Sequence, residues 1–96
     1  MEIIYADTFF KRFKGLMGKK NFDYIMVFTN LTDSSIHTMF MRFEIDIYFV
    51  DKNGVIFDKV TLRPWKFYKP KKHAKYIIET EKNKLNLKIG DKLDFL

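Results

Sequence analysis

The sequence has no cysteine, so neither a disulfide framework nor a thiolate metal site can form. Proline and glycine are also scarce, with two and four residues in a chain of 96. No apolar run is long enough for a membrane helix, and the chain enters a strand-like alternation directly after Met1, with no signal peptide pattern. These absences predict a cytoplasmic protein without a membrane span.

Arginine is rare as well. The net charge of +6 comes from fifteen lysines and three arginines against twelve acidic residues. Such a charge allows weak attraction to any polyanion but identifies none. A lysine-rich surface is also typical of proteins from heat-adapted organisms, so the positive charge can be explained without a binding partner.

Large apolar side chains are abundant, including eleven Phe, five Tyr and one Trp. Their burial can offset the entropy of ordering the backbone, which excludes a disordered chain. Because two halves would each be too small to bury a core, residues 1–96 are predicted to form a single domain.

Short strand-like segments separated by turn residues run along most of the sequence. The clearest is Asp46 to Val50, followed by a turn ending in Asn53-Gly54 and a second arm from Val55 to Leu62. Asn-Gly favours the positive φ angles of a type I′ turn, so this pair is predicted to be a β-hairpin that ends before Pro64.

The remaining segments predict further strands and one or two short helices. The expected strands are Glu2 to Ala6, Tyr76 to Glu79 and Asp91 to Leu96, and the expected helices are Thr8 to Met17 and Glu81 to Leu87. Tyr24 to Thr29 is an unbroken apolar run, and the faces of Ile36 to Phe43 are assigned on the assumption that it is a strand. Six or more short strands favour a compact, mainly β fold, either a sandwich or a partly open barrel with the helices at an end or an open edge.

Three blocks of sequence together carry a resemblance to a known family. They are Thr8-x-x-x-Arg12-x-x-Gly15-Leu16-Met17, then Ile36-His37-Thr38-x-Phe40-Met41-Arg42-Phe43-x-Ile45-Asp46 with Phe49-x-Asp51-x-x-Gly54, and finally Pro64-Trp65, Ala74-x-Tyr76-x-x-Glu79 and Leu87-x-Ile89-Gly90-Asp91. Their order and spacing resemble domain of unknown function 192, also called uncharacterised protein family 0127. The resemblance covers nearly the whole chain.

The resemblance implies a mainly β, jelly-roll-like fold and no established biochemical activity. This chain departs from the family pattern at two positions. Glu44 stands where the family usually has Pro, and Lys19 lies near a position that is often Arg. The change at Glu44 weakens the argument for a rigid turn at that point.

Two of the three arginines, Arg12 and Arg42, lie inside these blocks. A chain that otherwise uses lysine uses arginine where planar, bidentate recognition is needed, so both positions are predicted to bind a carboxylate or another oxyanion. Arg42 and Asp46 are about 13 Å apart in an extended strand and pair only if the chain bends. A structural ion pair and a ligand site remain alternatives.

The His37 region allows two further hypotheses. His37, Met39 and Met41 alternate as soft-metal ligands would, but Met commonly fills core gaps, so a core face is favoured and no metal or other cofactor is predicted. A hydrolase-like site would use His37 as base, Asp46 to orient it, Arg42 to stabilise an oxyanion and Thr38 as nucleophile. Because neighbouring strand residues face opposite ways, the hydrolase is disfavoured.

A nucleic-acid hypothesis rests on the acid-free stretch from Trp65 to Tyr76. The cations that would contact phosphates are Lys66, Lys69, Lys71, Lys72 and Lys75, and the aromatic rings between them could stack on bases. The competing interpretation is a solvated loop whose Trp65 and Tyr68 turn into the core, and the nucleic-acid hypothesis is kept as the alternative.

The favoured hypothesis is a small β-rich binding module for a small anionic ligand or a peptide carboxylate. Its predicted ligand-binding residues are Arg12, His37, Thr38, Arg42, Asp46 and Trp65. The sequence leaves open whether the two arginines and His37 converge on an open site or end in buried salt bridges. It gives no oligomeric state.

Overall fold

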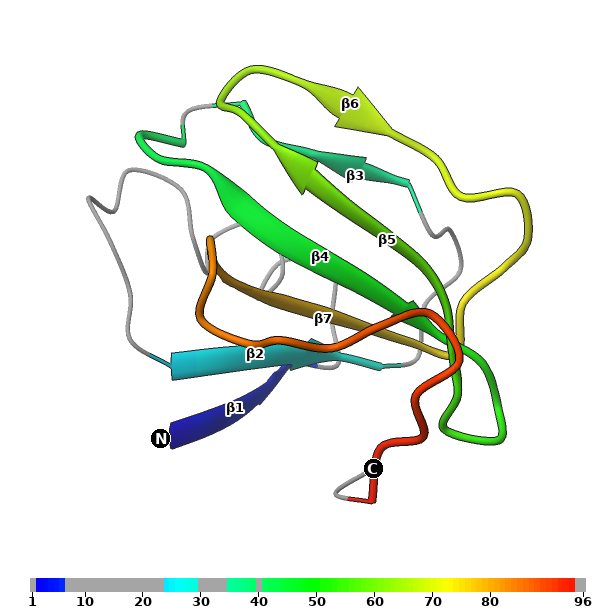
Figure 1. The fold of residues 1–96 in the computed structure, drawn as a ribbon. Helices are drawn as coiled ribbons and strands as arrows, with labels where there is room; N and C mark the ends of the chain where they lie inside the picture. The colour runs from blue at the N-terminus through cyan, green and yellow to red at the C-terminus, as the bar shows by residue number, and fades with distance from the viewer. Residues whose placement is uncertain (1, 7–23, 30–34, 40, 95–96) are drawn as a thin grey trace.

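The hairpin predicted from Asn53-Gly54 lies at one edge of the main sheet. A computed structural model of the chain describes residues 2–6, 24–29, 35–39 and 41–94 (Figure 1). Within this part, strands β4 (Ile45–Val50) and β5 (Ile56–Leu62) pair antiparallel, and β5 ends just before Arg63-Pro64. The predicted hairpin is confirmed.

The predicted turn type is wrong. Gly54 has a positive φ of 80°, but Asn53 does not, so the loop is not a type I′ turn. The reason is the Asp51 carboxylate, whose Oδ1 accepts hydrogen bonds from the backbone N–H of Asn53 at 2.8 Å and of Val55 at 3.0 Å. The Asp51 carboxylate thus organises the turn. The strand register also shifts between Phe49 and Val50, where Phe57 is the extra residue of β5.

Five strands form the main sheet in the order β1-β2-β7-β4-β5. β1 and β2 are parallel neighbours, whereas the other pairs are antiparallel. The three strands not yet given are β1 (Glu2–Ala6), β2 (Tyr24–Phe28) and β7 (Tyr76–Glu81). β4 is therefore enclosed by strands on both sides, and all six of its residues are buried.

A second layer covers one face of this sheet. β3 (Ile36–His37) pairs antiparallel with β6 (Phe67–Tyr68), and Figure 1 shows the pair above β4 and β5. Ile36 and Tyr68 point inward to a core cluster, which includes Ile45, Ile47 and Phe49 from β4. Their neighbours lie on the other side of the pair, where Phe67 is exposed and His37 is partly buried, with its Nδ1 closed off from solvent.

The C-terminal segment covers the opposite face. Tyr48 and Val50 of β4 join a second core cluster there, against which Leu85, Leu87 and Leu93 pack. The orange-to-red trace in Figure 1 shows this segment returning across the sheet after β7. The central strand β4 is thus buried from both sides, and the mainly β fold class is confirmed.

The helix predicted from Glu81 to Leu87 is wrong. Glu81 ends β7, the chain turns at Asn83 with a φ of 65°, and an irregular segment follows. Because Leu85 and Leu87 lie two residues apart and pack on the same cluster, this segment runs extended rather than helical. The predicted last strand is represented, in its described part, by one bridge between Val55 and Lys92. The predicted helix from Thr8 to Met17 lies outside the described residues.

Candidate functional site

Thr38 is the point at which the β3 region is fastened to the loop between β5 and β6. Its backbone N–H donates to the carbonyl oxygen of Lys66 at 2.8 Å, and its own carbonyl accepts from the N–H of Trp65 at 2.8 Å and of Met41 at 3.2 Å. These bonds bring residues 38, 41 and 65 together. The side chains next to them in sequence therefore share one region of the surface.

The Thr38 hydroxyl fastens the same loop a second time. It donates to the carbonyl oxygen of Arg63 at 2.6 Å and accepts from the N–H of Lys66 at 2.8 Å. The residue is fully buried. A buried hydroxyl that is already engaged on both sides is neither a nucleophile nor a ligand contact, so both predicted roles of Thr38 are replaced by a structural one.

Trp65 sits on this fastened loop and points outward. Its φ is 63°, in the left-handed region that non-glycine residues rarely adopt, and 60% of its surface is exposed. The interpretation that Trp65 turns into the core is therefore wrong. For Tyr68 it is correct, because that ring packs 5.6 Å from the Phe49 ring and its Oη donates to Asp58 at 2.6 Å.

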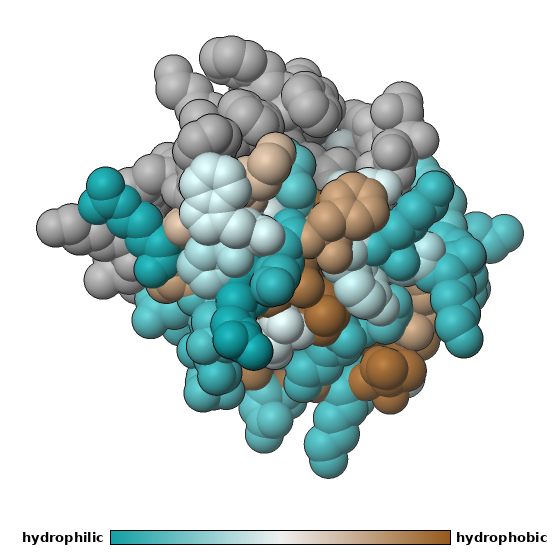
Figure 2. Space-filling view, turned by 90° about the horizontal axis from the view of Figure 1, so that it is seen from above, coloured by the Kyte–Doolittle hydropathy of each residue, from teal (hydrophilic) through white to brown (hydrophobic). Residues whose placement is uncertain are grey.

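Two more large apolar side chains are exposed on the segments that Thr38 joins. Met39 is 42% exposed, and Phe67, which pairs with His37 across β3 and β6, is 68% exposed. We call Met39, Trp65 and Phe67 the Trp65 surface. Figure 2 looks down on this side of the molecule and shows pale and light-brown groups set among teal hydrophilic side chains.

The strand predicted from Ile36 to Phe43 is two residues long. A turn follows Thr38, after which Met41 is buried while Met39 is exposed. The shared core face predicted for His37, Met39 and Met41 is therefore wrong at Met39. No group of three His, Asp or Glu side chains in the described residues is arranged to hold a metal ion.

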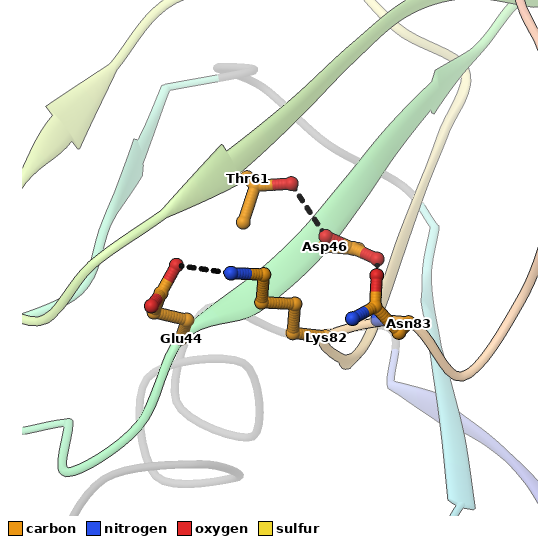
Figure 3. Close-up of polar contacts among 5 residues, drawn as sticks. All are labelled: Glu44, Asp46, Thr61, Lys82 and Asn83. Atoms are coloured by element: carbon orange, nitrogen blue, oxygen red, sulfur yellow. Dashed lines mark hydrogen bonds and ion pairs between the residues drawn. The ribbon is translucent and has the colours of Figure 1, made fainter.

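Asp46 binds groups on two other segments. Its Oδ1 accepts from the Thr61 hydroxyl at 2.6 Å, and its Oδ2 accepts from the backbone N–H of Asn83 at 2.9 Å (Figure 3). The carboxylate is 5% exposed and shares the Tyr48 side of β4. Asp46 thus holds the turn after β7, which removes it from the predicted ligand site and from the role of orienting His37.

Arg42 is exposed, and within the described ranges it forms no ion pair with Asp46. The ion pair beside Asp46 joins Lys82 Nζ to Glu44 at 3.3 Å (Figure 3). Both partners are more than a third exposed, so this pair adds about 0–1 kcal/mol at most. Arg42 follows Met41, whose N–H is bound to Thr38, so its backbone lies close to the loop that carries Trp65.

The β3–β6 pairing and the backbone hydrogen bonds of Thr38 bring together the two segments that carry His37, Arg42 and Trp65. Thr38 is buried, Asp46 lies on the Tyr48 side of β4, and Arg12 lies outside the described residues. Sequence reasoning missed Met39, Arg63 and Phe67 as surface neighbours. It also assigned no role to Glu79, a buried carboxylate that is in register with Ile47 and Met26. The two isoleucines before Glu79 were the signal in the sequence that this acidic residue belongs to a buried strand.

Of the lysines of the nucleic-acid hypothesis, Lys66 lies on the loop between β5 and β6, and the other four lie on the connection between β6 and β7. Lys66, Lys69, Lys71, Lys72 and Lys75 are all exposed. Lys72 Nζ lies 4.7 Å above the Phe57 ring, which places this lysine beside the β4–β5 hairpin. The hydrogen bond from the Val55 N–H lowers the pKa of Asp51 most. The bond from the Asn53 N–H and the positive charges of Lys72 and Lys52 lower it further.

Two tyrosines have raised pKa values for different reasons. Tyr48 is fully buried, and burial followed by the charge of Asp46 raises its pKa, while its Oη donates to the Leu85 carbonyl at 3.1 Å. For Tyr68, the hydrogen bond to Asp58 raises the pKa most, and burial adds to it. Both phenols are held in the protonated form by the fold.

We expect the protein to lose stability in alkaline solution because of these two groups. Below the unfolded-state pKa of 10.0 both tyrosines are protonated whether the chain is folded or not, and their contribution is fully present. As pH rises past 10, the unfolded chain releases these protons first, so the free energy of unfolding falls. Urea unfolding at several pH values measures the slope. Tyr68→Phe should reduce it, and an unchanged slope would contradict the assignment.

The chain matches a known family model and several curated proteins. The DUF192 model, described as Uncharacterized ACR, matches residues 1–95. A UPF0127 protein of Thermococcus sibiricus is 48% identical over 98 residues, covering 94% of this chain and 63% of that protein. A UPF0127 protein of Pyrococcus furiosus is 38% identical over 102 residues, covering 99% of this chain and 87% of that protein. The chain thus spans less than two thirds of the first relative, and both come from thermophilic archaea.

Two solved structures share the fold. A protein of unknown function from Novosphingobium aromaticivorans superimposes with a TM-score of 0.82 at 19% identity, covering 94% of this chain and 71% of that one. A protein titled a putative transcription regulator from Sinorhizobium meliloti gives a TM-score of 0.82 at 18% identity, covering 94% and 78%. At such identity the likeness concerns the fold. In the described residues, no helix is long and apolar enough to cross a membrane.

Proposed function

Because the chain belongs to the DUF192 family, whose name carries no activity, we propose a function from the surface itself: a small binding module for a ligand with a planar part and an anionic group. The observation that carries the proposal is Trp65. A non-glycine residue in a left-handed conformation costs about 1–3 kcal/mol, and such strain persists only where the surroundings impose it. Here the strain presents the one Trp of the chain to solvent.

The apolar part of the ligand would lie on the Trp65 surface. Large apolar side chains exposed next to one another are uncommon in a monomer and mark contact sites more often than scattered ones do. Trp65 and Phe67 offer flat rings, and Met39 offers a flexible thioether that adapts to different shapes. A planar ligand gains most from such a combination.

The anionic group is inferred from the charges around this surface. Arg42, Arg63 and Lys66 are all exposed and adjoin the residues that Thr38 fastens together. No acidic residue occurs from Arg63 to Tyr76 to oppose them. Two of the three cations are arginines in a chain that has only three, and arginine recognises carboxylates and phosphates through paired hydrogen bonds.

The single Trp makes the proposal directly testable. Titration with nucleotides, aromatic carboxylates and sugar phosphates should change the fluorescence of Trp65, since a stacked ligand alters its exposure. The same ligand should raise the melting temperature in proportion to its concentration over its dissociation constant. If no compound of the panel changes either signal, the binding module is rejected.

Matched variants locate the site. Arg42→Lys keeps the charge but removes the fork, so it should weaken binding several-fold if the anion is held bidentately. Ile89→Ala removes an exposed apolar side chain of the C-terminal segment and should leave binding unchanged. Equal effects of the two substitutions would show that the ligand does not use the Trp65 surface.

A further inference from the structure

We propose that the ligand of the Trp65 surface is a single-stranded nucleic acid, whose backbone continues along the lysines between β6 and β7. The inference rests on the proposed function and names its partner. It joins two observations, the exposed rings beside Thr38 and the exposed, acid-free run of cations that starts at the same place.

The cations form a path that leads away from the rings. At one end of the path, the backbone N–H of Lys66 is bound to Thr38. At the other end, the ammonium group of Lys72 lies over the Phe57 ring, beside the hairpin loop that contains Asp51. Figure 1 shows this connection in yellow, running from β6 down to the hairpin end of the sheet. Six residue steps of extended chain cover at most about 20 Å. This length suits several phosphates in a row better than one small anion.

The lysines are available for such contacts. Lys69, Lys71 and Lys75 are exposed. The Asp51 carboxylate interacts with Lys72 at the far end of the path. Phosphate contacts of this kind supply affinity without sequence readout, and the affinity falls with salt as counterions are released.

The rings favour single strands over duplexes. Bases in a duplex stack on one another, whereas those of a single strand are free to stack on aromatic side chains. Phe67 and Trp65 expose most of their surface beside Lys66, so ring and cation alternate along the chain. Stacking on rings and contacts to phosphates do not distinguish one base from another, so we expect little preference for sequence.

The test uses fluorescein-labelled oligouridylate and oligothymidylate of about 15 nucleotides, a length that fills the sites of known single-strand binders. Fluorescence anisotropy is measured from about 50 to 200 mM salt. Binding should weaken steeply over this range. Comparison of the two probes shows whether the ribose hydroxyl contributes.

Two charge-matched triple variants separate the path from general charge. The first replaces Lys69, Lys71 and Lys75 with Gln, and the control replaces Lys84, Lys88 and Lys92 of the C-terminal segment with Gln. Loss of three phosphate contacts should lower the slope of log affinity against log salt by about 2, at roughly 0.7 per contact. The control should keep the slope. Equal changes in both variants would overturn the proposed path.

The rings are tested separately. Trp65→Ala or Phe67→Ala should weaken oligonucleotide binding about 5- to 150-fold, the range found for stacking aromatic residues, whereas Ile89→Ala should not change it. Circular dichroism and the melting temperature confirm that each variant is folded.

Other outcomes reject the inference in distinguishable ways. If a mononucleotide or carboxylate changes Trp65 fluorescence but the oligonucleotides bind no tighter, the binding module stands and the nucleic-acid partner fails. Tighter binding to a duplex or to vesicles of phosphatidylserine would also reject the single-stranded partner. If no planar anion binds at all, both proposals fail together.

Discussion

Phe49→Ala is expected to lower the free energy of unfolding by about 3–5 kcal/mol, the range for deleting a buried aromatic side chain. Phe49 is fully buried on the central strand β4. Its ring lies 5.6 Å from the Tyr68 ring and 6.4 Å from the Phe57 ring. It is therefore a contact between the main sheet and the β3–β6 layer within the shared core cluster, and its removal leaves a cavity there.

Urea unfolding followed by circular dichroism measures this loss, and Phe67→Ala serves as the matched control. Phe67 is exposed, so the same chemical change there should shift stability by about 0.5 kcal/mol or less. Since small domains are stable by only about 5–15 kcal/mol, Phe49→Ala should bring the protein close to unfolding at high temperature. A loss below about 1.5 kcal/mol would mean that the layers are joined elsewhere.

The elements that local chemistry determines could be predicted from the sequence. The β4–β5 hairpin follows from alternating apolar residues on either side of a glycine-containing turn, and its outcome is confirmed. The type of turn could not be predicted from Asn53-Gly54 alone, because the Asp51 carboxylate competes for the same backbone N–H groups.

Segments whose conformation depends on distant partners were predicted poorly. Residues after His37 have the composition of a strand, yet Thr38 hydrogen bonds to residues more than 24 positions later, and the chain turns there. The segment after Glu81 has helix-forming residues, yet it extends because two leucines reach the second core cluster. In both cases tertiary contacts override local propensity.

The candidate site was predicted in part for the same reason. The rarity of arginine directed attention to Arg42, but nothing in the sequence distinguishes a carboxylate that binds Arg42 from one that binds Thr61 and Asn83, as Asp46 does. The exposure of Trp65 was not predictable either, since tryptophan is usually buried to a large extent. The loop that carries this ring is fixed by hydrogen bonds to Thr38, which lies far away in the sequence.

Thr38→Val is the second substitution for which we expect a large effect, and it should lower both the free energy of unfolding and the affinity for a ligand. Valine has nearly the shape of threonine but lacks the hydroxyl. The carbonyl of Arg63 and the N–H of Lys66 would therefore each lose a hydrogen-bond partner next to the buried side chain at position 38. Each buried group left without a partner costs about 1–3 kcal/mol, and we therefore expect a loss of about 2–4 kcal/mol in the free energy of unfolding.

Thr38→Ser distinguishes the hydroxyl from the packing of the methyl group. It retains both side-chain hydrogen bonds and should cost about 1 kcal/mol for the lost methyl group. The same pair of variants reports on the site, because Trp65 is held in its left-handed conformation by the loop that the hydroxyl fastens. In Thr38→Val, at a temperature where the variant is still folded, the fluorescence anisotropy of Trp65 should fall and any ligand of the Trp65 surface should bind more weakly. If Thr38→Val unfolds more easily while both of these signals stay as in Thr38→Ser, then Thr38 supports the fold alone, and the orientation of Trp65 has another cause.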